Sequence, residues 1–189
     1  MTEISQNTLF EILDVDFASG LLYWKPRPKK FFQNCKLPHR AEAIWNARYA
    51  GKRAFTIVNR HGYLSGRIFS KGYLAHRVIW IMAHGVWPKI IDHKNRQPSD
   101  NRLCNLREAT HSQNGANMKR GRKTSSDFYG ISWVTRDGKW TVRVRKDGRV
   151  YCGGNFDSEI DAAIARDALA KKLQGEFAIL NFMDGERGQ

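Results

Sequence analysis

The chain has 189 residues, which is enough for one medium-sized domain or two small ones. Its 32 Lys and Arg residues against 18 Asp and Glu residues give a formal net charge of +14, which favours a nucleic-acid partner, although an ordinary basic soluble protein shares this feature. No stretch approaches the roughly 20 apolar residues of a membrane span, and the first residues are acidic and amphipathic, so we expect a soluble intracellular protein without a membrane partner.

The first 40 residues predict a helix, a strand and a loop. Residues 5–16 are expected to be helical because their apolar side chains fall on one stripe, which Gly20 ends. Residues 21–24 then predict a strand. Residues 26–40 are basic and contain Pro, which is typical of a mobile loop, and they carry no motif that assigns them a role.

The next part predicts a basic antiparallel sheet and a buried helix. Residues 53–58 and 63–69 alternate in the manner of strands, and residues 76–82 form an apolar run that Gly85 and Pro88 close. The sheet is expected to expose the cations Arg53, Arg60, Arg67 and Lys71, of which we assign Arg67 to DNA contact.

The three cysteines support neither a disulfide framework nor a zinc site. They are odd in number, far apart and in no Cys-x-x-Cys pair. We therefore expect Cys35, Cys104 and Cys152 to be free thiols.

A basic linker and a second small unit complete the chain. Residues 118–126 hold too few apolar residues to fold alone, and their charges are either merely solvated or contact phosphate. The residues 129–134, 140–145 and 149–152 predict three strands joined by Asp-Gly turns, followed by a helix from the cap Ser158 to Leu173. The linker cations assigned to DNA contact are Lys119, Arg120, Arg122 and Lys123.

The segment 90–117 concentrates the residues that can cleave a phosphodiester. Such a reaction needs a base that activates water and a cation that stabilises the developing charge. Asp92 offers a hard oxygen suited to Mg²⁺ or Mn²⁺, and the neighbouring His93 can accept a proton near neutral pH. Asn101 and Asn105, taken singly, could merely cap turns.

The run IIDHKNRQPSDNRLCNLREATHSQN, preceded by AHRVIW, resembles the HNH nuclease family, in the subgroup of phage and intron-encoded homing-type enzymes without zinc ribbons. The resemblance implies a ββα-metal core in which His93 is the general base, Asp92 and Asn114 bind the metal, and Asn105 braces the loop. His76 resembles a further recurring His, for which we expect a structural role. Because Asn114 stands at the third motif position, this is an H-N-N version, and an inactive copy is an alternative.

The C-terminal unit, FYGISW to LNF, is similar to the plant ethylene-response-factor (AP-two) DNA-binding domain, in which a three-stranded sheet enters the major groove. Independently, Val142 and Val144 alternate with Arg143 and Arg145, so apolar and basic faces are expected, although such a face can merely aid solubility. Near residues 152–156 the family pattern is one residue shorter, and Ser132 stands where relatives often have Arg. The expected DNA contacts here are Ser132, Arg136, Lys139, Thr141, Arg143, Arg145 and Arg149.

We therefore expect an α+β chain with an N-terminal basic sheet and HNH nuclease domain at residues 1–117, whose HNH core is 76–117, a linker at 118–126, an AP-two type domain at 127–182 and a tail at 183–189. The expected function is site-directed hydrolysis of double-stranded DNA, as a nick or a double-strand cut, by a monomer that uses one Mg²⁺ or Mn²⁺ ion, without a small-molecule substrate, in the host cytoplasm if the chain is phage-encoded. Two rivals are a non-catalytic DNA-binding regulator with a degenerate HNH domain and a basic RNA-binding or packaging protein.

Overall fold

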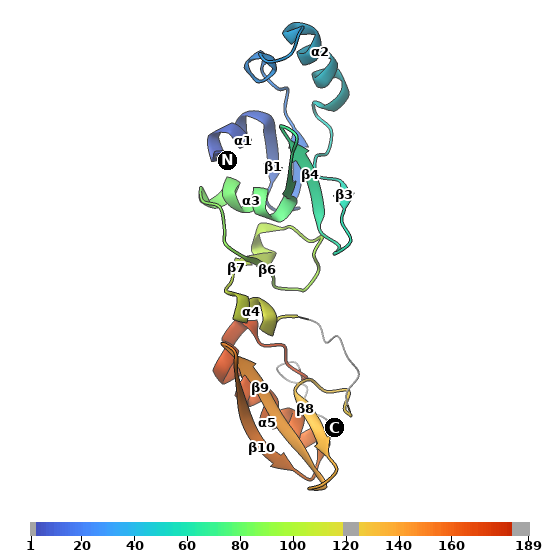
Figure 1. Ribbon diagram of the computed structural model, residues 1–189, viewed down its shortest axis with the longest axis vertical. Coiled ribbons are helices and arrows are strands. Elements are labelled where there is room, and N and C mark those ends of the chain that lie inside the picture. Colours follow the sequence, from blue (N-terminus) through green and yellow to red (C-terminus); the bar gives the residue numbers. More distant parts are fainter. Residues whose placement is uncertain (1–2, 119–124, 183–189) are drawn as a thin grey trace. The chain divides into compact units, whose positions relative to one another are not determined.

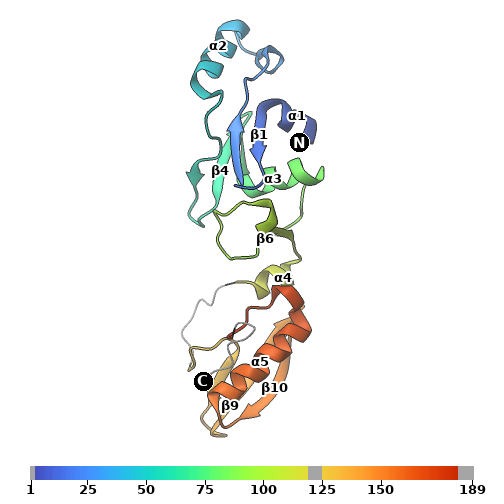
Figure 2. The ribbon, with the colours of Figure 1, turned by 180° about the vertical axis from the view of Figure 1, so that it is seen from behind.

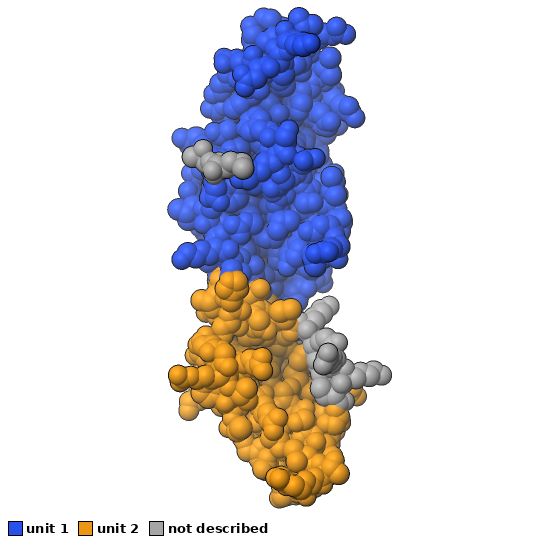
Figure 3. Space-filling view, in the orientation of Figure 1, with its two compact units in different colours: residues 1–108 blue, residues 109–189 orange. Residues whose placement is uncertain are grey.

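A computed structural model describes residues 3–118 and 125–182 of the chain (Figure 1). Helices mix with several small antiparallel sheets, as the predicted α+β class requires. The chain divides into two compact units, residues 1–108 and 109–189 (Figure 3). This division falls inside the segment 90–117, whereas the sequence places a domain boundary after residue 117.

Unit 1 begins with helix α1 (Gln6–Ile12), which is followed directly by the antiparallel strands β1 (Leu13–Asp16) and β2 (Leu21–Trp24). The prediction of a helix through residue 16 is therefore wrong for its last turn. The Leu-Asp-Val-Asp run alternates with a period of two, and its pairing with β2 overrides the helical stripe.

The predicted loop at residues 26–40 is also wrong in part. The structure has a 3₁₀ turn, η1 (Lys29–Phe32), and helix α2 (Pro38–Tyr49), which buries none of its residues. Pro38 stands in the first turn, where its fixed φ suits a helix. Asn46 ties α2 to the preceding segment, because its side chain accepts from the Arg27 N–H at 2.8 Å and donates to the Arg27 carbonyl at 3.2 Å.

A three-stranded sheet follows, in the order β3 (Ile57–Val58), β4 (Leu64–Ile68) and β5 (Lys71–Leu74). β3 is shorter than the predicted strand 53–58 because Phe55 has a φ of 56°, which no strand residue can adopt. Gly66 of β4 lies against Phe55, and a Cβ there would meet the Phe55 Cα at 3.2 Å.

Helix α3 (Ala75–His84) extends the predicted buried run 76–82, and Gly85, with a φ of 78°, ends it. It packs on α1 and on the sheet to form the core of unit 1, in which Leu9, Ile12, Ile79 and Met82 are fully buried or nearly so. Burying each of these side chains contributes roughly 1.5–3 kcal/mol.

Two short strands carry the chemical segment. β6 (Ile91–His93) pairs antiparallel with β7 (Leu106–Glu108), and the 3₁₀ turn η2 (Leu103–Asn105) lies between them in sequence. The β1–β2 turn supports this segment, since the Leu103 N–H donates to the Phe17 carbonyl at 3.0 Å. The contact is so close that a Cβ on Gly20 would lie 2.3 Å from the Asn101 carbonyl carbon.

Unit 2 contains α4 (His111–Ala116), the strands β8 (Ile131–Val134), β9 (Lys139–Lys146) and β10 (Arg149–Phe156), helix α5 (Glu159–Gln174) and the turn η3 (Gly175–Phe177). The sheet order is β10-β9-β8, and α5 covers one face of it (Figure 2). Ser158 caps α5 as predicted, since its side chain accepts from the Asp161 N–H. The core consists of Ile131, Val142, Ala162 and Ala163.

β10 runs four residues beyond the predicted strand end at residue 152, and a bulge between Cys152 and Gly154 makes this possible. The bulge places one additional residue of β10 opposite β9. At the bulge, a Cβ on Gly153 would lie 2.4 Å from Val142 Cγ1, so the close approach of β10 to β9 requires glycine there.

The described cysteines, Cys35, Cys104 and Cys152, are free, as predicted, and all three are exposed. Within residues 3–118 and 125–182, no helix has the length and apolarity that crossing a bilayer requires.

Candidate active site and nucleic-acid interface

His93 ends strand β6 and is buried, with 5% of its surface exposed. Its Nε2 lies 3.2 Å from the Asn101 Oδ1. An amide oxygen can only accept, so Nε2 carries the proton of the neutral imidazole and Nδ1 is the nitrogen with the basic lone pair. Burial lowers the pKa of His93, against opposing contributions from Asn101 and from nearby carboxylates, so the ring is uncharged at neutral pH.

Two further rings surround His93. The ring centroid of His76, from α3, lies 5.0 Å away in an edge-on arrangement, and that of Tyr63 lies 5.7 Å away. Burial, followed by the nearby His93, lowers the pKa of His76 to about 3. The buried Nδ1 of His76 has no hydrogen-bond partner among the described residues. His76 therefore packs as a neutral ring beside the candidate base, which accords with the structural role expected for it.

Asp92 is held by Arg107 across the β6–β7 pair. The two residues are direct partners in the register, and both Nε and Nη2 of Arg107 lie 2.8 Å from Asp92 Oδ2. Both side chains are nearly buried, so this ion pair is shielded from solvent. Because successive strand residues point to opposite faces, Asp92 and His93 are directed to different sides of β6.

Asn105 spans the loop between the two strands. Its Oδ1 accepts from the Asn95 N–H at 3.0 Å, and its Nδ2 donates to Asn95 Oδ1 at 3.0 Å and to the Asp100 carbonyl at 2.8 Å. Asp100 in turn accepts hydrogen bonds from Arg102, which holds the pKa of that carboxyl at about 2. Asn105 thus ties two parts of the loop together, and its bracing role stays a prediction.

Asn114 and His111, the two candidates for the last motif position, both lie on α4 in unit 2. Thr110 and Gln113 form a capping box that fixes the start of this helix. Asn114 is half-buried, whereas His111 is exposed. Asp92 belongs to unit 1, and the pairing of Asp92 with Asn114 stays a prediction.

The donors available for a metal are hard oxygens. Within residues 3–118 and 125–182, no group of three or more His, Cys, Asp or Glu side chains lies close enough together to hold a metal. A carboxylate and an amide oxygen suit Mg²⁺ or Mn²⁺ in a site where phosphate oxygens and water supply the remaining ligands. The donor chemistry therefore fits such an ion, which would share the Asp92 carboxylate with Arg107.

The sheet of unit 2 separates the predicted DNA contacts into two groups. Ser132 pairs with Thr141, and the odd-numbered residues of β9 alternate with the buried Val142 and Val144, so Arg143 and Arg145 project from the face opposite α5. Arg149 pairs with Lys146, an even-numbered residue of β9, and therefore points to the other face of the sheet. The residues that share the face opposite α5 are Ser132, Lys139, Thr141, Arg143 and Arg145.

The predicted DNA contacts also differ in the ion pairs and hydrogen bonds that they form. Lys139 pairs with Asp157, Thr141 donates to Asn155, and Arg136 lies in the β8–β9 turn, where it pairs with Asp137. Arg143 and Arg145 are exposed. The linker cations Lys119, Arg120, Arg122 and Lys123 lie outside the described residues.

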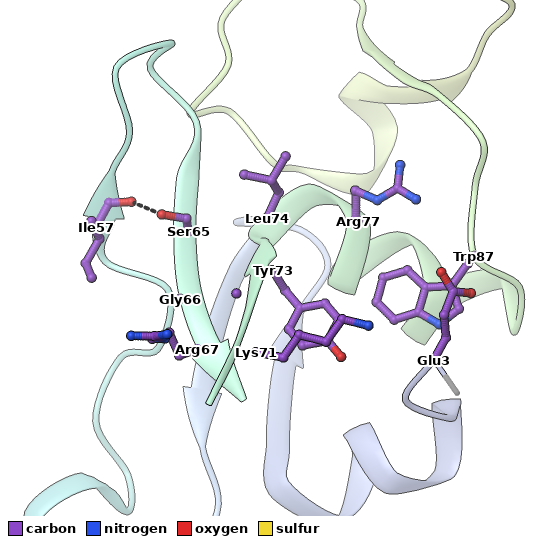
Figure 4. A pocket seen from close by; sticks show the side chains of 11 residues that line it. Glu3, Ile57, Ser65, Gly66, Arg67, Lys71, Tyr73, Leu74, Arg77 and Trp87 are labelled. Atoms are coloured by element: carbon purple, nitrogen blue, oxygen red, sulfur yellow. Dashed lines mark hydrogen bonds between the residues drawn. The ribbon is translucent and has the colours of Figure 1, made fainter. Parts of the chain in front are cut away.

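Arg67 lies on β4 in unit 1 and borders a hollow of about 460 Å³ (Figure 4). Lys71 and Arg77 add two cations to this hollow, and Tyr73 and Trp87 stack on each other with their centroids 5.6 Å apart. Arg77 donates to the carbonyls of Pro88 and Lys89. Arg67 is exposed, and its position on the basic sheet agrees with the expected placement.

Sequence reasoning assigned no role to two residues of this site, Asn101 and Arg107. Asn101 binds the ring of His93, and Arg107 binds Asp92. Asn101 lies in the Asp-Asn-Arg run, and Arg107 lies in the Asn-Leu-Arg run. The sequence therefore contains both residues, but it does not show which side chains they contact.

Comparisons with known proteins bear on the same segment. The family model for the HNH endonuclease matches residues 73–116. The chain is 34% identical over 116 residues to "Protein 3.8" of Escherichia phage T7, an alignment that covers 58% of this chain and 92% of that protein. No solved structure matches.

Proposed function

The chain belongs to the HNH endonuclease family, and we propose that it hydrolyses phosphodiester bonds in double-stranded DNA at selected sites, with His93 as the general base. The observation that carries this proposal is the buried, uncharged His93, oriented by Asn101 and adjacent to Asp92, inside the matched segment 73–116. A general base must be able to accept a proton at neutral pH, and a neutral imidazole can.

In the proposed reaction a water molecule gives a proton to His93 Nδ1, and its oxygen attacks the phosphorus. The bond from phosphorus to one ester oxygen breaks, and that oxygen leaves with a proton from solvent. Asp92 and Asn114 would hold a divalent cation, Mg²⁺ or Mn²⁺, which when bound stabilises the negative charge that develops on the phosphate. Asn105 keeps the loop between β6 and β7 in place, so that His93 stays directed at the attacking water.

The C-terminal unit would position the DNA. A sheet face with exposed Arg143 and Arg145 beside Thr141 offers donors for bases and phosphates, as in an AP-two type domain. We propose that residues 127–182 serve as this reader, with Arg67 and the linker cations as phosphate contacts, in a monomeric homing-type enzyme. Arg136 and Arg149 would contribute at the edge of the sheet.

Nicking of a supercoiled plasmid tests the function. We expect conversion to open-circular or linear DNA with Mg²⁺ and none with a chelator. Sequence-specific binding without conversion in Mg²⁺ or Mn²⁺ would indicate a non-catalytic regulator. Binding to any nucleic acid, RNA included, without cleavage would indicate a packaging protein.

The identity of the second metal ligand can be tested by a matched pair of variants on α4. Asn114 lies nine residues after Asn105 (114 − 105 = 9), as the family resemblance requires, whereas His111 lies six after it (111 − 105 = 6). Asn114→Ala should raise the Mg²⁺ concentration needed for nicking or abolish nicking, and His111→Ala should change it little. The reverse ranking would mean that His111 is the ligand.

A further inference from the structure

A second hollow in unit 1, of about 540 Å³, lies where α2 faces the β3–β4 part of the sheet. Aromatic rings from Trp24, Trp45, Tyr49, Phe55 and Phe69 line it together with the guanidinium groups of Arg27, Arg53 and Arg67. None of the residues that line it is acidic. The hollow is therefore aromatic and strongly positive, and its volume falls in the range of about 300–1,000 Å³ typical of ligand pockets.

Arg27 is the central feature of this hollow. Only 8% of its surface is exposed, and its buried Nε has no hydrogen-bond partner among the described residues. Within residues 3–118 and 125–182, no acidic side chain forms an ion pair with it. Aromatic rings surround the guanidinium, with the centroid of Trp45 at 3.9 Å and that of Phe69 at 4.9 Å, but these rings carry no net charge. An external anion that enters the hollow would therefore supply the missing counter-charge.

The rings are arranged to hold a planar group as well as an anion. The Arg27 guanidinium lies 3.9 Å from the ring centroid of Trp45, and the rings of Trp45 and Tyr49 lie side by side with their centroids 5.2 Å apart. Trp45 and Tyr49 are only half-buried, so part of each ring faces the hollow or the solvent. A partly exposed aromatic ring beside a guanidinium group can stack a nucleobase.

The backbone around the hollow is strained. Phe55, Phe69 and Ser70 have φ values of 56°, 47° and 68°, and all three line the hollow. Phe69 and Ser70 form the two-residue β4–β5 turn, a position that usually takes Asn-Gly. Strain of this kind concentrates at ligand sites, because it persists only where the surrounding structure enforces it.

We propose that this hollow binds one unstacked nucleotide of a DNA strand, with its phosphate at Arg27, Arg53 and Arg67 and its base against Trp45 and Tyr49. The choice of DNA as the source of the nucleotide rests on the proposed function. Since base faces are hidden in an intact duplex, the hollow should prefer single-stranded or frayed DNA. The hollow beside Tyr73 is the weaker candidate, because its rings stack on each other and Arg77 is already bound to carbonyls.

Fluorescence of an eight-nucleotide single strand with a central 2-aminopurine tests the proposal on the full chain. The wild-type protein should quench the probe as the base stacks. Trp45→Leu should remove the quenching and weaken binding about tenfold, which lies within the range expected for the loss of one base–aromatic stack. Arg27→Met should weaken binding about tenfold, because it removes the buried cation that the phosphate would contact, while an uncharged chain of similar length can still pack against the ring of Trp45.

Two control variants each replace a side chain of the same kind at a position outside the hollow. Arg40→Met takes an exposed Arg from α2, and Phe10→Leu takes an exposed ring from α1, and both should bind the probe like the wild-type protein. If Trp45→Leu does not fold, the exposed pair Arg53→Gln and Arg67→Gln replaces it. Wild-type affinity and quenching in the Arg27, Trp45 and Arg53 variants would overturn the proposal, and so would a lower melting temperature of Arg27→Met with unchanged affinity.

The nuclease proposal and the nucleotide proposal fail separately. His93→Ala should quench the probe as well as the wild-type protein does. Quenching without plasmid nicking would refute the proposed function and leave the nucleotide site standing. Nicking without quenching would refute the nucleotide site alone.

Discussion

The polar side chains around His93 are buried, whereas the arginine side chains on the face of β9 opposite α5 are exposed. Around His93 the polar side chains are buried and bound to each other: Asn101 to His93, and Arg107 to Asp92. On β9, Arg143 and Arg145 are exposed and separated by buried Val144. A buried polar group without its partner is costly, while an exposed one costs almost nothing. Substitutions at the first region should therefore affect both folding and function, and those at the second should affect binding alone.

His93→Ala should give the largest effect. Loss of a general base lowers the rate of nicking by roughly 10²- to 10⁴-fold, while DNA affinity changes little, because the base acts in the transition state. Single-turnover nicking and a separate binding titration measure the two quantities, with the exposed His61→Ala as control. Nicking by His93→Ala at the wild-type rate would remove His93 from the catalytic role.

Arg107→Ala should lower the free energy of unfolding by about 3–5 kcal/mol, since it takes a buried cation away from the Asp92 carboxylate. Its matched control is Arg102→Ala, which breaks a pair with Asp100 in which half of the Arg102 side chain is exposed. That change should cost much less, because solvent screens an exposed ion pair. Urea unfolding of both variants measures the difference. Equal losses would show that burial of the Asp92 pair has no energetic consequence.

The pH dependence of stability tests the neutral packing of His76. Its pKa is lowered to about 3 in the folded chain, so the unfolded chain binds a proton first as the pH falls below about 6.5. The contribution of His76 to stability is thus intact above pH 6.5 and is lost progressively towards pH 3. Between pH 6.5 and 4.5 the loss should be about 2–3 kcal/mol.

His76→Leu should reduce the stability that the protein loses between pH 7 and pH 4.5, because the substituted side chain cannot take up a proton. The comparison uses urea unfolding of both proteins at pH 7 and pH 4.5. If the two proteins lose the same stability on acidification, His76 is not the group that titrates.

The smallest effect on stability is expected on β9. Arg143→Gln should change the free energy of unfolding by no more than about 0.5 kcal/mol, because the side chain is exposed. It should nevertheless reduce the slope of log affinity against log salt concentration by about 0.9, the value for one phosphate contact. Arg149 points to the other face of the sheet, so Arg149→Gln should change the slope less. An identical reduction for both would mean that the face opposite α5 does not define the DNA contacts.

Sequence patterns were informative where local rules determine structure. Alternation along residues 140–145 and the cap at Ser158 appear in β9 and α5, because strand parity and helix capping depend on near neighbours. The family resemblance pointed to Asp92, His93 and Asn105, and the structure brings these three into one loop and its flanking strands.

Other features depend on contacts that no local pattern contains. β1 replaces the end of a helix because β2 pairs with it. Helix α2 begins inside the segment 26–40, whose composition indicated a loop, and continues to Tyr49. Arg27 lies in the same segment 26–40. Its role as a buried cation depends on its contact with Trp45 of α2, which the sequence does not show. The Asp92–Arg107 pair likewise depends on the β6–β7 register, which residue spacing did not reveal.

The contact beneath Gly20 has an evolutionary consequence. The segment that resembles other HNH nucleases begins at residue 73, yet the carbonyl of Asn101 rests on a turn at residues 17–20, far outside it. A recombination event that transferred residues 73–116 alone would leave that turn behind and take away the support of the residue that orients His93. The unit of inheritance for this domain should therefore include the first hairpin. Homologous chains that keep the motif but lose the hairpin should carry a substitute at the same place.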